Sequence, residues 1–226
     1  MPHTTIPTID LEPLLGGTEA GRRVVAAQVL DVYSNVGFAY LTNHGIPDEL
    51  IEGLFAASAE FHGLPRETKL ELEINRFHRG FIPINTSTDT TTRLATVTRP
   101  QQSESFMAMH ELAPDDPDVL AEAFLAGPNQ WPATLPGFRP AVRGYESAAA
   151  ALARQLVQAF AVALGLEPAG LDRHFAHPTT FLRLLNDPEQ PPSSPDDLYG
   201  SSPHTDYGFI TLLLQDDAGG LQVRST

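Results

Sequence analysis

The chain has 226 residues, of which 42% are hydrophobic and 19% charged, and its formal net charge is −14 at pH 7. These proportions are ordinary for a globular protein, and the length suffices for one domain with a sizeable core. The strong negative charge argues against nucleic acid and anionic membrane surfaces as partners. The absence of cysteine excludes disulfides and thiolate metal sites, which leaves histidines and carboxylates as ligands for a metal ion.

The chain shows no sign of secretion or of a membrane span. It lacks a basic N-terminal segment followed by an apolar one, and the absence of cysteine suits a reducing compartment. The longest apolar run, residues 148–166, has helical periodicity and is interrupted by Arg154 and Gln155. It therefore predicts a core helix instead of a transmembrane one. We expect a cytoplasmic protein.

The first part of the chain alternates short extended segments with helices. A helix is predicted over residues 18–36, because Thr18 can cap its start, valines recur along one stripe and Gly37 follows its end. Around it we expect an extended opening at residues 6–11, a strand at 38–42, a turn at 43–47 and a helix at 48–61.

The middle of the chain is less regular than the second half. Residues 65–114 show no clear period, and the Thr/Ser-rich run at 85–92 is too polar for a core, which indicates a mobile loop. Beyond this region we expect a short helix at 115–125, a proline-punctuated connector at 127–137, a long helix at about 139–164 that Gly165 ends, a strand at 179–186 and a loop at 188–202.

His204 and Asp206 stand two residues apart at the end of this loop. In an extended segment, positions i and i+2 face the same way, so an imidazole and a carboxylate would project side by side. These are two of the ligands that an open iron(II) site needs. A turn histidine beside a solvated aspartate is the alternative that the tripeptide alone leaves open. The apolar run at 209–214 predicts a buried strand, followed by a turn at 216–220 and a new strand from Leu221.

Residues 204–223 read His-Thr-Asp-x-Gly-x-x-Thr-Leu-Leu-x-Gln-Asp-x-x-Gly-Gly-Leu-Gln-Val. This motif resembles the first-ligand segment of the isopenicillin-N-synthase-like branch of iron(II)/2-oxoglutarate-dependent oxygenases. The resemblance covers nearly the whole chain. Further stretches match that family in the same order, namely residues 6–10, 37–47, 79–81, 127–132 and 181–186.

The resemblance implies an α+β fold built on a double-stranded β-helix (jelly roll) with N-terminal and flanking α-helices. It implies a single domain, with a helix and strand region at residues 1–115, scaffold helices at 116–178 and the first part of the jelly-roll metal-binding core at 179–226. In the family, a second histidine ligand and an Arg-x-Ser motif lie tens of residues beyond the first pair, whereas no histidine follows His204. We therefore expect a fragment whose jelly roll is incomplete at the C-terminus and which alone is inactive.

The implied activity is that of a non-haem iron(II) oxygenase, with Fe²⁺ as cofactor and with 2-oxoglutarate and O₂ as co-substrates. Such an enzyme couples decarboxylation of 2-oxoglutarate to oxidation of a small-molecule C–H bond by hydroxylation, desaturation or cyclisation. Two alternatives stay open: a family oxidase that does not use 2-oxoglutarate, and a jelly-roll module that binds a ligand without catalysis. We expect a small-molecule substrate, no nucleic acid and no membrane. Neither the substrate's identity nor the oligomeric state is predicted.

Candidate site residues follow from residue type together with this resemblance. His204 and Asp206 are the expected metal ligands. Arg183 and Asn186 are the expected contacts of 2-oxoglutarate, since a dianion needs a local cation in so acidic a chain. Arg183 could instead form a surface pair with Asp187 or Glu189, and Asn186 with Asp187 could instead signal a turn. Substrate contacts are expected from Arg79, Phe81, Phe106, Met107, Tyr207 and Phe209, with core packing as the alternative for Phe81, Phe106 and Met107.

Overall fold

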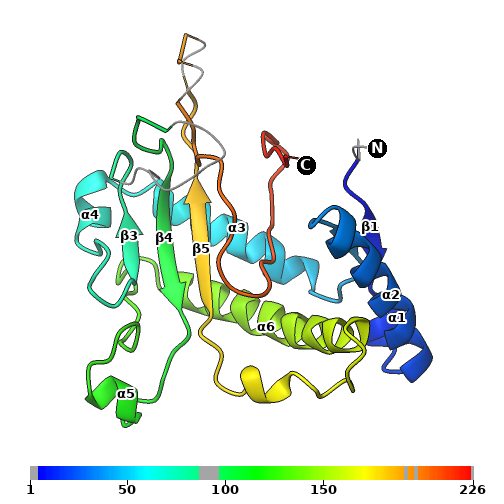
Figure 1. Ribbon diagram of the computed structural model, residues 1–226. Helices are drawn as coiled ribbons and strands as arrows, with labels where there is room; N and C mark the ends of the chain where they lie inside the picture. The colour runs from blue at the N-terminus through cyan, green and yellow to red at the C-terminus, as the bar shows by residue number, and fades with distance from the viewer. Residues whose placement is uncertain (1–4, 87–96, 191–192, 196–197, 225–226) are drawn as a thin grey trace. The chain divides into compact units, whose positions relative to one another are not determined.

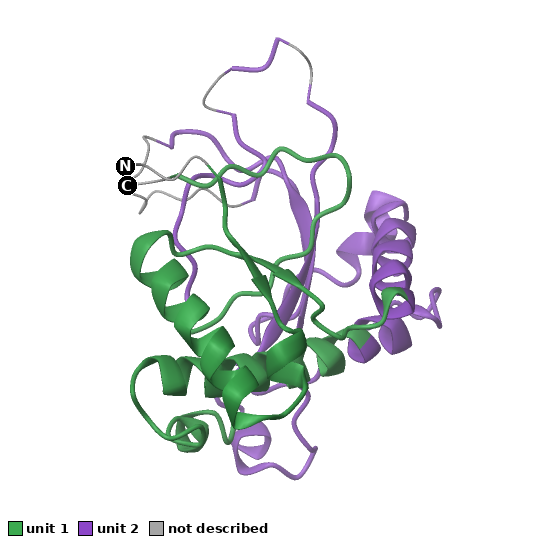
Figure 2. Cartoon of the chain, turned by 90° about the vertical axis from the view of Figure 1, so that its right-hand side faces the viewer, with its two compact units in different colours: residues 1–48, 145–178, 208–226 green, residues 49–144, 179–207 purple. Residues whose placement is uncertain are grey.

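A computed structural model of the protein describes residues 5–86, 97–190, 193–195 and 198–224. Both helices and strands occur (Figure 1), which confirms the α+β class. The chain forms two compact units that alternate along the sequence (Figure 2). The first unit comprises Met1–Asp48, Tyr145–Pro178 and Gly208–Thr226, and the second comprises Glu49–Gly144 and Thr179–Tyr207.

Two expectations about the organisation of the chain are not decided by these units. The division into parts at residues 1–115, 116–178 and 179–226 stays a prediction. The loop expected at residues 85–92 lies for the most part outside the described residues.

The first unit opens with two short parallel strands, β1 (Thr8–Asp10) and β2 (Tyr40–Thr42). Two helices, α1 (Glu12–Leu15) and α2 (Glu19–Asn35), connect them. Parallel strands need a crossover of about a dozen residues or more, and these helices supply it. The predicted strand at 38–42 is therefore confirmed in its second half.

Helix α2 confirms the helix predicted over residues 18–36. The Thr18 hydroxyl caps its start by accepting a hydrogen bond from the N–H of Gly21 at 3.0 Å. Gly37 follows its end at a φ of 83°, a left-handed conformation that glycine adopts without strain, and its N–H donates to the Val32 carbonyl at 3.0 Å.

The long helix α6 (Phe138–Ala163) confirms the helix predicted at about 139–164, and Gly165 follows it with a φ of 76°. Within the first unit, the Phe160 ring meets the Tyr33 ring of α2 edge-on, with 5.0 Å between the ring centroids. Among the helices of the described residues, none combines the length and apolarity that a membrane crossing requires.

The second unit is built on a three-stranded antiparallel sheet in the order β3-β4-β5 (Figure 1). The strands are β3 (Gly80–Ile82), β4 (Glu104–Met109) and β5 (Phe181–Asn186). The predicted strand at 179–186 is thus confirmed. The helices of this part of the chain are α3 (Asp48–His62), α4 (Arg66–Leu70), α5 (Pro117–Leu120) and the start of α6.

One face of this sheet carries the core of the second unit. Phe81, Phe106 and Leu184 are opposite one another in the register, and all three are buried. The Phe106 ring packs against Phe61 of α3 and Phe138 of α6, with centroid separations of 4.8 and 5.0 Å. The prediction that Phe81 and Phe106 contact the substrate is therefore wrong, because strand alternation directs both rings into this core.

Strands β3 and β4 lie in residues 65–114, where no regular element was predicted. β3 has only three residues, and β4 has buried side chains on both faces. A strand that is buried on both faces does not alternate between apolar and polar residues, so it lacks the signal from which strands are predicted.

Residues 209–214 were expected to form a buried strand and do not. Alternate side chains are exposed and half-buried, as in an extended chain, but the run pairs with no other strand of the described residues. The new strand expected from Leu221 is also absent, since residues 221–224 pair with no strand of the described residues. The turn at 216–220 is confirmed, since an Asp216 carboxylate oxygen accepts a hydrogen bond from the Ala218 N–H at 3.0 Å. The first unit also contains a 3₁₀ helix, η1 (Asp172–His174).

Candidate metal centre

His204 and Asp206 lie side by side in the second unit, on the segment that follows β5. The His204 Nε2 is 3.1 Å from Asp206 Oδ1, and the two side chains are 47% and 50% exposed. The segment is not a strand, yet the two-residue spacing still brings both groups together. Both polar tips can be reached from solvent, as a site that takes up an ion and small ligands requires.

The other ring nitrogen of His204 is held by the backbone. Nδ1 lies 2.7 Å from the carbonyl oxygen of Ser202. A carbonyl oxygen can only accept a hydrogen bond, so in the neutral ring the proton sits on Nδ1. The lone pair is then on Nε2, the nitrogen beside Asp206, where it is available to a metal ion.

This donor set fits two neighbouring positions of a divalent metal ion. Nitrogen and oxygen ligands bind such ions at about 2.1 Å, so two ligands at right angles are about 3.0 Å apart. The Nε2–Oδ1 separation of 3.1 Å matches that spacing. A neutral imidazole and a carboxylate are also two members of the 2-His-1-carboxylate set of non-haem iron. Across the residues that the structure describes, no third His, Cys, Asp or Glu joins them.

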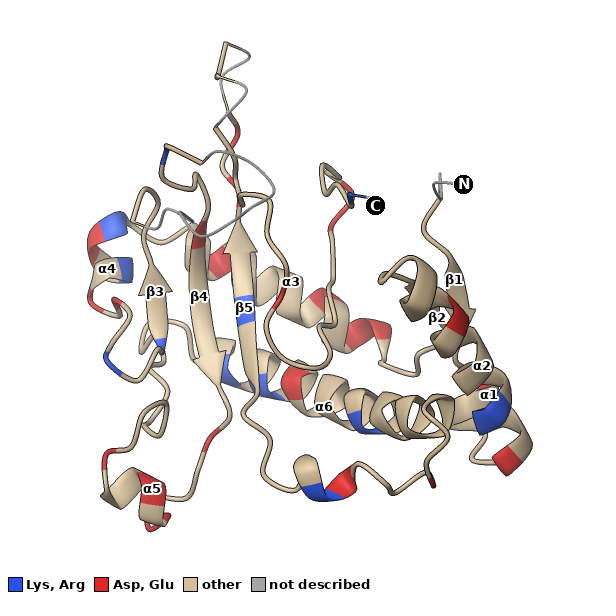
Figure 3. Ribbon diagram, in the orientation of Figure 1, with Lys and Arg blue, Asp and Glu red and all other residues tan. Residues whose placement is uncertain are grey.

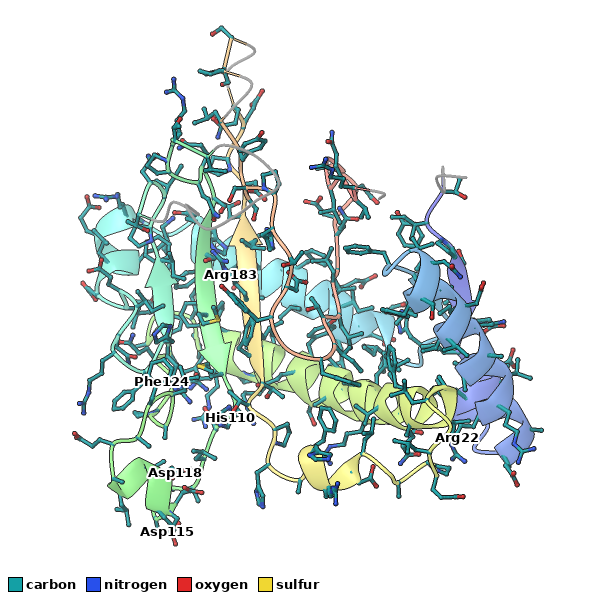
Figure 4. All side chains as sticks on the ribbon, viewed as in Figure 1. Arg22, His110, Asp115, Asp118, Phe124 and Arg183 are labelled. Carbon is teal, nitrogen blue, oxygen red and sulfur yellow. The ribbon has the colours of Figure 1, made fainter. Side chains whose placement is uncertain are left out.

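Arg183 is a half-buried cation in the middle of β5 (Figure 4). It lies opposite Met107 in the register, so the two share the sheet face that is turned away from Phe106. Its Nε donates to the Ser105 hydroxyl at 2.9 Å. Burial lowers the pKa of the Arg183 guanidinium, and the nearby Asp187 carboxylate partly offsets this by raising it. An arginine stays charged in proteins, so a desolvated positive charge is present here.

This charge is isolated within its sheet. β5 has no other basic residue, and β3 and β4 have none (Figure 3). The surface-pair alternative is partly correct, because Asp187 is close enough to affect the Arg183 pKa. The side chain is half-buried, however, and its Nε donates to Ser105 on the face of the sheet.

Asn186 does not join Arg183. Residues three apart on a strand point to opposite faces, and the Asn186 amide donates instead to the Glu104 carboxylate at 3.1 Å. Glu104 also forms a 2.7 Å ion pair with Lys69, whose side chain is 7% exposed. The prediction that Asn186 binds 2-oxoglutarate beside Arg183 is therefore corrected: Asn186 belongs to a buried polar cluster. Nothing in the sequence brings Lys69 and Glu104 together, so that cluster was not predicted.

Arg79 was predicted to contact the substrate and is instead fully buried. Its guanidinium donates to three backbone carbonyls, those of Phe77 and Leu125 at 2.8 Å each and that of His110 at 3.1 Å. Burial lowers the pKa of Arg79, partly offset by Glu111. Arg79 thus links the segment before β3, the segment after α5 and the residue that follows β4. Its side chain is not accessible to a ligand.

The three other predicted substrate contacts differ in their surroundings. Met107 is half-buried on the Arg183 face of the sheet, where it could meet a ligand. Tyr207, next to Asp206, is 90% exposed. Phe209 belongs to the first unit, and its ring packs against Phe160 and Phe175 with centroid separations of 5.5 and 5.2 Å.

Comparison with known families gives the class of this arrangement. Residues 6–134 match the family described as non-haem dioxygenase in morphine synthesis N-terminal. Residues 179–226, which hold β5, His204 and Asp206, match the 2OG-Fe(II) oxygenase superfamily. The sequence, the fold and the paired ligand types thus agree on a non-haem iron class.

Individual relatives narrow the class to a family. A protein of Emericella nidulans named 2-oxoglutarate-Fe(II) type oxidoreductase hxnY is 33% identical, over 99% of this chain and 64% of its own length. A Monascus ruber protein named 2-oxoglutarate-dependent dioxygenase citB is 34% identical, over 97% of this chain and 67% of its own length. The chain belongs to the iron(II)/2-oxoglutarate-dependent oxygenases, and it spans about two thirds of the length of these relatives.

Solved structures support the fold. A full-length Neurospora crassa protein, crystallised in complex with alpha-KG, superposes with a TM-score of 0.66 at 29% identity, covering 81% of this chain and 54% of that one. A further structure of that protein contains alpha-KG and thymine. A 2OG-Fe(II) oxygenase family protein from Caulobacter crescentus shares the fold, with a TM-score of 0.67 at 22% identity, over 81% and 56% of the two chains.

Proposed function

We propose that the protein is a non-haem iron(II) oxygenase that couples decarboxylation of 2-oxoglutarate and the reduction of O₂ to oxidation of a small-molecule C–H bond. The carrying observation is the His204–Asp206 pair, with 3.1 Å between Nε2 and Oδ1, in a segment that matches the 2OG-Fe(II) oxygenase superfamily. Family membership of the chain supports the same conclusion, and so do the names of its relatives, one a 2-oxoglutarate-Fe(II) type oxidoreductase and one a 2-oxoglutarate-dependent dioxygenase.

In this proposal, His204 and Asp206 hold the iron through Nε2 and a carboxylate oxygen. The iron, when bound, supplies the redox chemistry with O₂ that no side chain provides. Asp206 contributes the negative charge that partly neutralises the ion. The Ser202 carbonyl keeps the His204 proton on Nδ1, so that the ring binds through Nε2 alone.

Arg183 is proposed to bind an anionic group of the co-substrate or of the substrate. A chain of charge −14 repels a dianion at long range, so a local cation is needed to hold it. Arg183 is fixed by Ser105 and desolvated, both of which strengthen its attraction for a carboxylate. Met107, opposite it, offers an apolar surface on the same face.

We also propose that the sheet β3-β4-β5 is part of a jelly-roll core within one oxygenase domain. Structural similarity to oxygenases supports this architecture. The absence of cysteine suits a reducing compartment and so supports a cytoplasmic location for the protein.

Succinate formation tests the proposed activity. The full-length protein with Fe²⁺, 2-oxoglutarate and O₂ is expected to release succinate slowly without substrate and faster with a substrate from a small-molecule panel. Thymine belongs in that panel, because a relative binds it. His204→Ala and Asp206→Ala are expected to lose bound iron and succinate formation together, since each removes a metal ligand.

His174→Ala is the matched control for this experiment, because His174 is an exposed histidine of η1 in the other unit. It is expected to behave as the wild type. Stoichiometric iron in His204→Ala would refute the ligand assignment. Substrate consumption without succinate would support the oxidase alternative.

A further inference from the structure

The loop that carries His204 is fastened to the chain just before β4. Gln101 Nε2 donates to the Ser202 hydroxyl at 3.0 Å, and the Gln102 N–H donates to the Tyr199 carbonyl at 2.9 Å. Both donors lead directly into β4, the central strand of the sheet. Two hydrogen bonds therefore link an irregular loop to the segment that leads into the central strand of the sheet.

Ser202 connects these hydrogen bonds to His204, the candidate metal ligand. The residue is 1% exposed. Its hydroxyl accepts from Gln101, and its carbonyl accepts from Nδ1 of His204 at 2.7 Å. A shift of Ser202 would remove the acceptor of Nδ1, and the imidazole could then turn its Nε2 away from Asp206. In metal sites, such hydrogen bonds fix the tautomer and orientation of a ligating histidine.

We propose that Gln101 and Ser202 are positioning residues of the metal centre: the amide of Gln101 holds Ser202, and Ser202 holds the ring of His204. This inference rests on the proposed function, in which His204 and Asp206 bind the metal ion. Neither positioning residue contacts the ion. Each acts by limiting the directions in which the ring can face, so its loss should weaken metal binding without removing a ligand.

The test is the dissociation constant of the protein for Mn(II), measured anaerobically by calorimetry. The variants are Gln101→Ala, Ser202→Ala and the double variant. The matched control is Gln102→Ala, since the Gln102 side chain bonds to Asn85 and to the Pro100 carbonyl. The absorption spectrum of bound Co(II) adds a readout of ligand geometry, which a general loss of stability would not change.

Each single variant is expected to bind Mn(II) about threefold to tenfold more weakly, which corresponds to the net value of one hydrogen bond. The Co(II) spectrum should change in both, and Gln102→Ala should match the wild type. The double variant should bind no more weakly than the weaker single one, because both substitutions remove the same bond. Ser202→Thr keeps the hydroxyl and is expected to restore affinity relative to Ser202→Ala.

The outcomes separate the inference from the proposed function. If His204→Ala abolishes Mn(II) binding but Gln101→Ala and Ser202→Ala bind like Gln102→Ala, the positioning role is refuted and the proposed function stands. Additive losses in the double variant would also refute it, since the two residues would then act independently. If the wild type and His204→Ala bind Mn(II) equally, the proposed ligands are wrong, and the positioning role fails with them.

Discussion

The guanidinium of Arg183 has more hydrogen-bond donors than the described residues of the chain accept. Within the described part of the chain its one hydrogen bond runs from Nε to Ser105. The two Nη groups of the guanidinium thus keep their donors for another acceptor, in the planar fork that suits a carboxylate. Asp187 supplies charge nearby, but the pKa of Arg183 remains lowered because burial outweighs that attraction.

Arg183→Ala is expected to raise the KM of an anionic substrate or co-substrate by about tenfold to a hundredfold, the value of a charged hydrogen bond. The KM of Arg183→Lys should lie between those of the wild type and Arg183→Ala. Lysine keeps the positive charge but lacks the planar guanidinium and its bond to Ser105. Steady-state kinetics with each substrate varied in turn identifies the ligand that is bound. Arg76→Ala is the control, because the Arg76 guanidinium is exposed and paired with Glu122.

The same variants distinguish binding from folding. Arg183→Ala should change KM far more than the midpoint of thermal unfolding. A large loss of stability with an unchanged KM for every substrate would show that Arg183 only supports the sheet.

At the scale of elements, a buried ion pair joins α4 to β4. Lys69 and Glu104 are 2.7 Å apart, with side chains 7% and 12% exposed. The Lys69 ammonium also donates to the His62 carbonyl at 2.9 Å and lies 5.1 Å from the Phe81 ring centroid. Asn186 donates to the same Glu104 oxygen, so this polar cluster also connects β5 to α4 and β4. A charge buried in this way depends on its partner, because neither can be resolvated alone.

Lys69→Met is expected to lower the free energy of unfolding by about 3–5 kcal/mol, because it leaves the Glu104 carboxylate buried without its counter-charge. The double variant Lys69→Met/Glu104→Leu should lose much less than the sum of the two single variants. Urea unfolding measures these differences. Arg23→Ala, which removes a largely exposed i, i+4 pair with Glu19, is the control and should change stability by less than about 1 kcal/mol. Equal losses in Lys69→Met and Arg23→Ala would contradict a stabilising role for the buried pair.

The elements that the sequence predicts well are those whose signals are local. The cap at Thr18 and the glycines at 37 and 165 place the ends of α2 and α6 within about one residue. The run at 209–214 shows the limit: its apolar character is a local signal, but a strand also needs a neighbouring strand, and none pairs with this run among the described residues. Likewise, the spacing of His204 and Asp206 brings them together without any strand.

The remaining site errors have a common physical cause. A buried arginine such as Arg79 is rare, so an arginine in the sequence suggests a surface or functional position. Only the fold reveals the three backbone carbonyls to which its two Nη groups donate. Asn186 was misplaced because the strand's alternation puts it on the face opposite Arg183, next to a carboxylate that is distant in sequence.

At the scale of the whole chain, the excess of acidic residues is the main electrostatic feature. The sequence has 28 acidic residues against 14 basic ones, and the acidic positions are spread over helices and loops (Figure 3). Self-repulsion among them opposes the compact state. Exposed pairs such as Arg76 with Glu122 gain little from their attraction, whereas the buried Lys69–Glu104 pair is screened weakly by salt.

Added NaCl should therefore stabilise the chain at pH 7. Raising the salt from about 0.01 to 0.1 M shortens the Debye length from about 30 to 10 Å, which screens the long-range repulsion but leaves buried contacts nearly intact. The unfolding midpoint is expected to rise by a few degrees over this range and then to level off. Differential scanning fluorimetry at several NaCl concentrations measures it, with choline chloride as a control for specific cation binding at the metal centre. A midpoint that falls with salt would mean that surface ion pairs outweigh the repulsion, and a rise with NaCl alone would assign the effect to bound cations.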